Sequence, residues 1–454
     1  MDIPTLVESQ RVYFNSNATK AVNFRIEQLK RLRSLLKENE SSIFEAIHSD
    51  YKKSGFDSFL TEFLVVYDDL EVAIRNASRW AKARRVRTNL MNWPAKSSII
   101  PEPLGVTLVI GAWNYPIQLS LAPAIASMVA GNTIILKPSE LCSATSAITA
   151  KLINGNFAPE YFKVVEGGIP ETTELLGQQF DKIFFTGSTT VGRTVYQAAA
   201  KHLTPVTLEL GGKSPVIVTP GCDLDIPVKR LVWAKFLNAG QTCIAPDYVL
   251  VHESVEAVFI DKVKQAIIDA NLSISNGNYV QIINERNTAR IVDLIDPAKV
   301  VLGGGHSIRD RYIAPTLMAG VQFTDKIMSE EIFGPVLPIL CYTDLDAAIA
   351  EIKARPKPLS LYLFTNDRRT KEKVLREVSF GGGCVNDAIM HISNGRLPFG
   401  GVGASGHGRY HGEAGFNAFS HHKSILEKPN WFEPSMKYFP HTPMKLKLLR
   451  WFAR

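Results

Sequence analysis

The chain has 454 residues, of which 45% are hydrophobic and 21% charged, and its formal net charge is +7. A chain of this length buries large cores and is expected to form two domains or more. No apolar run reaches the roughly 18 residues of a membrane helix, the start lacks a signal-peptide pattern, and basic residues are mostly interspersed with acidic ones, which disfavours a transmembrane or a nucleic-acid-binding protein.

The cysteines are few, odd in number and widely scattered, which does not suggest a disulfide framework. They also lack the paired spacing of a metal site, so no metal is expected. We therefore expect a cytoplasmic protein. The five cysteines are Cys142, Cys222, Cys243, Cys341 and Cys384.

Three helices are predicted early in the chain. Apolar residues recur at helical spacing over residues 22–36, Ser42 and Glu45 form a capping box for the next helix, and a third helix covers about residues 60–80. A proline-bounded extended segment follows at residues 96–103.

From Gly105 onward, short apolar strands alternate with helices, which is typical of a doubly wound parallel sheet. A second set of strands and helices begins beyond Ser214, so the fold class is α/β with two such units. Strands of the first unit are predicted at residues 106–110, 133–136, 163–165, 182–185 and 207–210. Strands of the second are predicted at residues 215–218, 248–251, 336–340, 361–364 and 384–386.

Polar residues and a glycine gather at the ends of the first unit's strands. Ligands of such sheets bind outside the carboxyl ends of the strands, so these residues describe one site. The segment 187–192 lacks the usual three-glycine dinucleotide fingerprint. The residues at the strand ends are Asn114, Lys137, Gly187, Ser188 and Glu209.

Two residues stand out as candidates for covalent chemistry. Cys243 lies between a helical pattern and a strand, where its sulfur can face a cleft and the amides of the turn can lower its pKa. A cysteine in such a place is otherwise a small buried hydrophobe. Glu209 is a lone carboxylate in an apolar strand, which is a poor structural choice and a good general base.

Other glycines and histidines are assigned less specific roles. The triplets at 303–305 and 381–383 predict turns, because no convincing helix start follows either one. His391, His407 and His411 flank a glycine-rich loop without metal spacing and are expected to be structural.

These segments resemble the aldehyde dehydrogenase superfamily, and further motifs follow in that family's order over nearly the whole chain. The Ala-Pro-Asp of residues 245–247 and the Arg-Tyr-His-Gly of 409–412 look most like the class 3 branch, which oxidises fatty and aromatic aldehydes. The other matching segments are residues 111–116, 136–140, 185–188, 331–335 and 398–401.

The resemblance implies NAD(P)-dependent oxidation of medium-chain, long-chain or aromatic aldehydes to carboxylic acids. Cys243 would attack the aldehyde to give a thiohemiacetal and then a thioester, because a carbonyl carbon cannot readily lose hydride. Asn114, with the backbone N–H of Cys243, would stabilise the alkoxide. Glu209 would activate the water that hydrolyses the thioester.

The resemblance also implies which residues hold the cofactor in the Rossmann-like unit. A carboxylate at Glu140 favours the 2′-hydroxyl of NAD over the 2′-phosphate of NADP, although the nearby Lys137 could soften this preference. NAD is therefore expected, with NADP possible. The implied cofactor residues are Trp113, Lys137, Glu140, Thr186, Gly187, Ser188, Glu331 and Phe333.

By the same resemblance, residues 1–80 and 105–210 form the NAD-binding domain and residues 211–393 the catalytic domain. Residues 81–104 and 394–454 form bridging or oligomerisation segments and a carboxy-terminal tail, and a homodimer is expected. The tail at 444–454 mixes apolar and basic residues, so it could pack on a partner subunit or make weak peripheral contact with a membrane.

Three alternatives have different sequence requirements. A CoA-acylating relative would pass the thioester to CoA, which an intact Glu209 argues against. A structural, crystallin-like use of the fold would not need Cys243, Glu209 and Asn114 all intact. A serine hydrolase would need a Gly-x-Ser-x-Gly elbow, which the sequence lacks.

Overall fold

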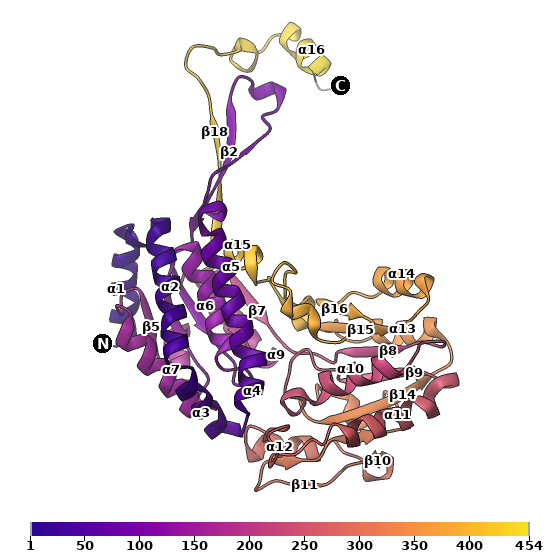
Figure 1. Ribbon diagram of the computed structural model, residues 1–454. Helices are drawn as coiled ribbons and strands as arrows, with labels where there is room; N and C mark the ends of the chain where they lie inside the picture. The colour runs from indigo at the N-terminus through magenta and orange to yellow at the C-terminus, as the bar shows by residue number, and fades with distance from the viewer. Residues whose placement is uncertain (1, 453–454) are drawn as a thin grey trace.

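The structure is a computed structural model and describes residues 2–452. Figure 1 shows two α/β halves side by side and a long arm that rises away from the first half. Chain colour separates the halves, since indigo and magenta segments form one and pink and orange segments the other. The chain crosses from the first half to the second just after Glu209 and returns to the first half at residues 406–418.

The first half is built on a sheet of six strands in the order β17-β7-β6-β3-β4-β5. All of its pairs are parallel except β17 with β7. The predicted strands are confirmed to within two residues, and their nearly continuous burial is what a sheet covered on both faces requires. The strands are β3 (Val106–Ile110), β4 (Thr133–Lys137), β5 (Phe162–Val164), β6 (Lys182–Thr186), β7 (Val206–Glu209) and β17 (Gly406–His407).

Helices cover this sheet, and α6 is buried along its whole length. The capping box predicted at Ser42 and Glu45 is wrong, because α3 already begins at Glu40 with Asn39 as its N-cap. The predicted helix from residue 60 begins instead as a π-helical turn, Phe59–Phe63, and the first helix of the chain was not predicted. The helices are α1 (Ile3–Asn15), α2 (Val22–Glu38), α3 (Glu40–Tyr51), α4 (Gly55–Ser58), α5 (Leu64–Trp80), α6 (Gln118–Ala130), α7 (Ser143–Asn156), α8 (Ile169–Leu176), α9 (Thr189–Ala200) and α15 (Gly412–Ala418).

The second half is built on a sheet of seven strands in the order β10-β13-β14-β9-β8-β15-β16, in which only the β10–β13 pair is antiparallel. Strands β10 and β13 were not predicted. The strands are β8 (Pro215–Val218), β9 (Tyr248–His252), β10 (Val300–Leu302), β13 (Thr316–Met318), β14 (Val336–Tyr342), β15 (Ser360–Phe364) and β16 (Gly382–Val385). The helices are α10 (Asp225–Phe236), α11 (Glu256–Asp269), α12 (Glu285–Val292), α13 (Leu345–Lys353) and α14 (Arg368–Glu377).

The two glycine triplets differ in structure. Residues 303–305 form the predicted turn, between β10 and the short strand β11 (His306–Ser307). The turn predicted at 381–383 is wrong, because β16 starts at Gly382. A Cβ on Gly383 would lie 2.0 Å from the carbonyl oxygen of Leu361, so glycine is required here for strand pairing rather than for a turn.

The arm is an antiparallel ladder of β2 (Lys96–Pro103) and β18 (Ser420–Glu427), which pair along their full length. The short strand β1 (Arg84–Val86) extends the ladder on one side, and α16 (Pro443–Phe452) lies beyond its tip (Figure 1). The extended segment predicted at residues 96–103 is confirmed, but its partner β18 was not predicted. Exposed apolar side chains along the arm include Leu90, Met91, Trp93, Leu426, Trp431 and Phe439.

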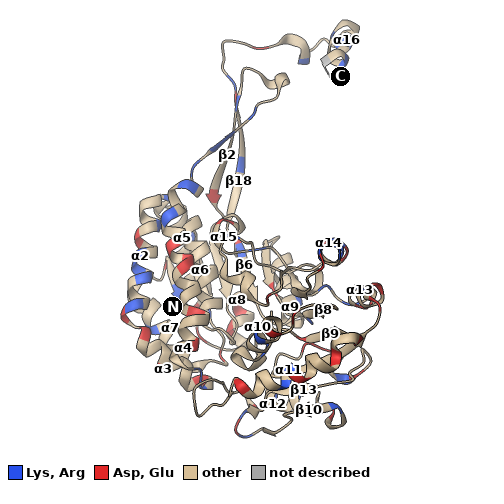
Figure 2. Cartoon of the chain, turned by 45° about the vertical axis from the view of Figure 1, so that its right-hand side comes forward, with Lys and Arg blue, Asp and Glu red and all other residues tan. Residues whose placement is uncertain are grey.

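Acidic and basic residues are mixed along the helices of both halves, as the sequence indicated (Figure 2). Within residues 2–452, no helix has the combination of length and apolar character that crossing a bilayer demands. Within the region 394–454, expected to form bridging or oligomerisation segments and a carboxy-terminal tail, β17 joins the sheet of the first half and α15 packs on α6.

Candidate active site

The carboxyl ends of the parallel strands in the first sheet meet at one edge. Lys137 of β4 pairs with Ile110 at the end of β3, and Glu209 of β7 pairs with Thr186 at the end of β6. The backbone N–H of Gly187 donates to the backbone carbonyl of Glu209 at 3.0 Å. Predicted cofactor residues and the predicted base therefore share this edge of the sheet.

Cys243 follows a tightly bent loop after α10. Asn238 and Ala239 are both buried and have φ values of 53° and 52°, in the left-handed region that side-chain-bearing residues rarely adopt. A Cβ on Gly240 would lie only 2.3 Å from the carbonyl oxygen of Gly334, so this contact requires glycine. The strained loop is thereby packed against a second loop, which fixes the position of Cys243.

Asn114 is held by two hydrogen bonds to this loop and by a third from Tyr51 of α3. Its side-chain amide donates to the backbone carbonyl of Gln241 at 3.0 Å. Its own backbone carbonyl accepts from the Tyr51 hydroxyl at 3.2 Å and from the Asn238 amide at 2.9 Å. A primary amide carries two N–H groups, so the second one can donate to an oxygen bound next to Cys243.

The turn was predicted to lower the pKa of Cys243. This prediction is wrong, because the contributions that raise this pKa exceed those of the turn that lower it. Burial raises the pKa of the thiol, and the carboxylates of Glu331 and Glu209 raise it further. Backbone hydrogen bonds at Cys243 and Ile244 lower this pKa, but they are the smaller contributions. The thiol therefore needs a base to take its proton before the sulfur can attack.

Glu209 is buried, and neither of its carboxylate oxygens accepts a hydrogen bond from residues 2–452. Burial raises the pKa of its carboxyl well above the ordinary value, while the charge of Arg409 acts in the opposite direction. A buried carboxyl without partners is costly for folding. It is suited to exchange protons with a ligand or with water.

Glu331 and Phe333 lie on the loop that packs against the Cys243 segment. A Cβ on Gly211 would lie 1.9 Å from Glu331 Oε2, so the carboxylate occupies space that only a glycine leaves open. Burial, followed by the charge of Asp247, raises the pKa of Glu331 to about 8. The ring of Phe333 meets the ring of Trp113 edge to face at 5.3 Å, which joins two predicted cofactor residues from distant parts of the sequence.

This loop is anchored by residues whose roles the sequence did not reveal. Lys213 Nζ donates to Asp247 Oδ2 at 2.5 Å and to the backbone carbonyl of Glu330 at 2.7 Å. Asp247 Oδ1 accepts from the N–H of Ile332 at 2.9 Å, and Arg290 donates to the carbonyl of Ile332 at 2.7 Å. In the sequence, Lys213 follows Glu209 closely and Asp247 follows Cys243 closely. This proximity is the one feature of the sequence that could have identified them.

Lys137 and Glu140 are neighbours, as the resemblance implied. Lys137 is buried, and its Nζ donates to the carbonyl of Pro138 at 2.7 Å and to Glu140 Oε2 at 3.4 Å. The Glu140 side chain is 49% exposed, so its carboxylate is available to a ligand. A ribose with two hydroxyl groups fits a carboxylate and an ammonium group placed in this way.

Thr186 is the last residue of β6, and Ser188 immediately precedes α9. The Thr186 hydroxyl is buried, and no group in residues 2–452 hydrogen-bonds to it, so a bound molecule would satisfy it. Ser188 is the N-cap of α9, whose N–H groups favour anionic groups such as phosphate. Together with Lys137 and Glu140, these residues fit a dinucleotide along the edge of the sheet.

A cavity of about 360 Å³ leads to Cys243, and we call it the Cys243 cavity. Its walls come from the π-helical turn and α5, from α10 and from the loop after β16. Most of the lining side chains are apolar, which suits a hydrophobic substrate. Its apolar and aromatic lining includes Leu60, Tyr115, Leu119, Trp233, Ile389 and Phe399.

A buried polar network supports the wall of this cavity. Glu62 of the π-helical turn accepts from Lys53 Nζ at 2.8 Å and from the N–H of Ile117 at 2.8 Å. Lys53 Nζ also lies 4.4 Å from the centre of the Tyr115 ring, and the Tyr115 hydroxyl is 2.6 Å from Thr242 Oγ1. The network therefore connects the start of α6 to the residue preceding Cys243.

His411, expected to be structural, also lines the Cys243 cavity. Its Nδ1 donates to the carboxylate of Asp69 at 2.9 Å from Oδ2. Nε2 is buried and has no hydrogen-bond partner within residues 2–452. The structural prediction is thus incomplete, because the ring presents an unused polar atom near the cavity.

Comparison with known proteins agrees with this geometry. The profile of the Aldehyde dehydrogenase family matches residues 1–425. A 4,4'-diaponeurosporen-aldehyde dehydrogenase of Staphylococcus aureus is 45% identical over 449 residues, covering 98% of this chain and 97% of the relative. A dimeric NADP-preferring aldehyde dehydrogenase of Mus musculus is 43% identical over 448 residues, covering 98% and 99%. The substrate-bound structure of Staphylococcus aureus AldH matches all of both chains with a TM-score of 0.97 at 43% identity.

Proposed function

Because the chain belongs to the aldehyde dehydrogenase family and is an enzyme that oxidises aldehydes, we propose that Cys243 is its nucleophile, Asn114 its alkoxide donor and Glu209 its general base. The observation that carries this proposal is the Asn114 amide bonded to the loop that ends in Cys243. Glu209 acts on the pKa of the same thiol, which supports a position close to it.

In the first half-reaction, Cys243 gives up its thiol proton to a solvent base, and Sγ bonds to the aldehyde carbon. The carbonyl oxygen becomes an alkoxide, and it accepts from the free N–H of the Asn114 amide and from the backbone N–H of Cys243. One such donor typically lowers a barrier by about 3 kcal/mol. Collapse of the alkoxide expels hydride and leaves an acyl thioester on Cys243.

In the second half-reaction, Glu209 takes a proton from water while the water oxygen attacks the thioester carbon. The carbon–sulfur bond breaks, the carboxylic acid leaves, and Cys243 is restored. Burial favours the neutral carboxyl of Glu209, so the group must first be ionised. This need supports a deacylation step that becomes faster as pH rises.

The proposed cofactor is NAD or NADP, which when bound supplies the hydride acceptor. Lys137 and Glu140 would hold the adenosine ribose, and Thr186, Gly187 and Ser188 would border the pyrophosphate. Trp113, Phe333 and Glu331 would border the nicotinamide end. The first half of the molecule, residues 1–80 and 105–210, would then be the cofactor domain, and residues 211–393 the catalytic domain.

The apolar lining of the Cys243 cavity supports aliphatic medium-chain and long-chain or aromatic aldehydes as substrates. One relative carries 4,4'-diaponeurosporen-aldehyde in its name. That relative and the one from Mus musculus are both named as dehydrogenases, which does not support a crystallin-like role. The Glu209 carboxylate supports hydrolysis of the thioester by water rather than transfer to CoA.

A homodimer built through the arm is also proposed. The apolar side chains on β18 and beyond it are exposed in the single chain, and a second subunit would bury them. One relative is named as dimeric. Weak membrane contact through the basic and apolar residues of α16 remains a secondary proposal. Five free cysteines support the proposed cytoplasmic location.

The proposed reaction is tested by mixing the purified protein with NAD and either a long-chain or an aromatic aldehyde. The protein should form NADH and carboxylic acid in equal amounts, and Cys243→Ala should form neither, because no thiohemiacetal can be made. Wild-type turnover by Cys243→Ala would disprove the assignment. If acyl-CoA formed when CoA was added, the proposed hydrolysis of the thioester would be wrong and the second half-reaction would be acyl transfer to CoA.

A further inference from the structure

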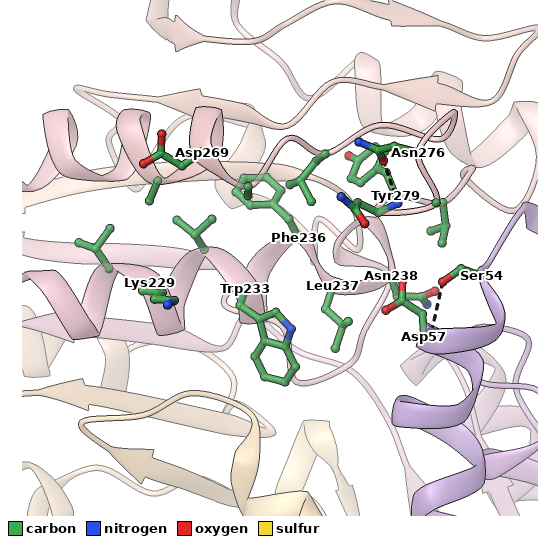
Figure 3. Close-up of a pocket in the computed structure, with 18 of the residues that line it drawn as sticks. Ser54, Asp57, Lys229, Trp233, Phe236, Leu237, Asn238, Asp269, Asn276 and Tyr279 are labelled. Carbon is green, nitrogen blue, oxygen red and sulfur yellow. Dashed lines mark hydrogen bonds between the residues drawn. The ribbon is translucent and has the colours of Figure 1, made fainter.

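A second cavity of about 950 Å³ runs along α10, and we call it the α10 cavity. Figure 3 shows Phe236 and Asp269 on the side of α10 that faces α11, Trp233 and Leu237 on its other side, and Ser54 and Asp57 beside α4 at one end. The proposed reaction uses none of these side chains. A cavity of this volume is large enough for a drug-sized organic molecule.

The α10 cavity adjoins the Cys243 cavity. Trp233 and Leu237 line both cavities, and in Figure 3 their side chains lie on the same side of α10. The facing wall is also continuous, because α4 contributes Phe56 to the α10 cavity and the following residues contribute Leu60 and Leu64 to the Cys243 cavity. The two cavities therefore adjoin at Trp233 and Leu237.

The chemistry of the α10 cavity favours an apolar occupant. Phe236 and other apolar residues of α10 line its inner wall. Among the charged groups of the lining, Lys262 is paired with Asp225, and Asp269 accepts a hydrogen bond from the Gln265 amide at 2.8 Å. Asp57 and Lys229 lie in the same lining. A ligand here gains from apolar contact and does not need to supply a charge.

We propose that the α10 cavity is a distal subsite for the chain of long aliphatic aldehydes. The aldehyde carbon reaches Cys243, the first part of the chain fills the Cys243 cavity, and the remainder passes Trp233 and Leu237 into the α10 cavity. This inference rests on the proposed function and extends it to a substrate class longer than the Cys243 cavity alone can hold. Short aldehydes use the first cavity only.

The test fills the distal subsite from an exposed position. Gln265 on α11 lines the α10 cavity and is exposed, so Gln265→Trp occupies the space with little risk to folding. Ile268→Trp is the matched control, because Ile268 lies on the same helix, is 59% exposed and does not line the cavity. Gln265→Ala tests the loss of the amide without filling the space.

The value of kcat/KM is measured with NAD for straight-chain aldehydes from hexanal to octadecanal, delivered from cyclodextrin. In the parent enzyme, the ratio of octadecanal to hexanal should exceed one. In Gln265→Trp this ratio should fall about tenfold, because each methylene that loses its contact costs about fourfold in affinity. Ile268→Trp and Gln265→Ala should keep the parent ratio.

An unchanged ratio in Gln265→Trp would overturn the distal subsite, as would an equal fall in Ile268→Trp. Failure of the proposed function gives a different result, since the parent enzyme would then oxidise neither hexanal nor octadecanal. Hexanal oxidation by the parent, with no difference among the three variants, leaves the proposed reaction intact and removes the subsite alone.

Discussion

At the scale of single residues, the proposed mechanism predicts that a change at Glu209 impairs the second half-reaction and leaves the first possible. Glu209→Gln keeps the shape of the side chain but cannot take a proton from water, so deacylation should become limiting. Mixing this variant with NAD and an aldehyde should give a burst of about one NADH per active site and then a slow steady rate. Mass spectrometry should find the acyl group on Cys243.

The contrary outcomes are specific. Steady turnover of Glu209→Gln at the wild-type rate would refute the general-base role, and acyl label on Cys142 or Cys384 would refute the nucleophile. Loss of the burst alone would indicate that Glu209 also takes the thiol proton. Cys243→Ala is the negative control, which should show no burst at any pH.

The raised pKa of Cys243 predicts a pH dependence for the same burst. Burial and two nearby carboxylates disfavour the thiolate, so its population, and with it the rate of the first turnover, should increase as pH rises. Stopped-flow measurement of the burst rate in Glu209→Gln between neutral and alkaline pH checks this. A rate that falls with pH would contradict the assignment of the thiol as the titrating group.

Glu140 makes a prediction about cofactor choice. Its half-exposed carboxylate should repel the 2′-phosphate of NADP, so NAD should give the higher kcat/KM. Glu140→Gln should shift the NAD-to-NADP ratio towards NADP by about threefold to tenfold. Glu8→Gln, on the exposed face of α1, is the control, and equal ratios in all three proteins would show that Glu140 does not face the ribose.

Much of the proposed catalytic set could be selected from residue type, because a lone glutamate in an apolar strand and a cysteine between helix and strand are unusual on their own. The pKa of Cys243 could not, since it depends on burial and on Glu331, which lies 88 residues further along the chain. The anchors Lys213, Asp247 and Arg290 escaped prediction for the same reason, because their partners come together only in the folded chain.

At the scale of elements, the buried pair of Lys53 and Glu62 predicts a large and coupled loss of stability. Both side chains are almost fully buried, so removing one leaves an uncompensated charge, and Lys53→Met alone should cost about 3–5 kcal/mol in the free energy of unfolding. Lys53→Met with Glu62→Gln should cost less than the sum of the single changes. Urea unfolding of the three variants measures this, and additive losses would contradict the coupling.

The same pair should influence catalysis through position. Because Glu62 binds the N–H of Ile117 and Lys53 packs on Tyr115, the double variant should shift Asn114 and lower kcat at a temperature where the protein is fully folded. An unchanged kcat would confine the network to stability. The π-helical turn that carries Glu62 could not be predicted, since its residues continue a helical pattern of apolar positions.

Elements with a strong periodic signal were predictable and those fixed by distant contacts were not. The buried strands β3, β4 and β6 each contain three consecutive apolar residues, β7 alternates apolar and polar residues, and all four fall within two residues of their predicted positions. By contrast, β18 has no apolar run, and its conformation depends on pairing with β2, more than 300 residues earlier in the chain. Gly382 and Gly383 suggested a turn, yet they form a strand because they pair with Ser360 and Leu361 of β15.

At the scale of the whole molecule, the apolar arm predicts a dimer. Light scattering should report about twice the chain mass of 50.3 kDa. Leu426→Glu, on the exposed surface of β18, should dissociate it, whereas Ile169→Glu, at an exposed site on α8, should not. A monomeric wild type at micromolar concentration, or a dimer that survives Leu426→Glu, would argue against assembly through the arm.

The strand β17 has a consequence for how the protein is made. Residues 406–407 add the last strand to a sheet whose other members are complete by residue 209, and they pair directly with the strand of Glu209. A nascent chain leaving the ribosome must therefore carry that strand as an open sheet edge while roughly two hundred further residues are synthesised. Open edges invite pairing with other chains, so a chaperone that shields β7 until synthesis is nearly complete would raise the yield of active enzyme.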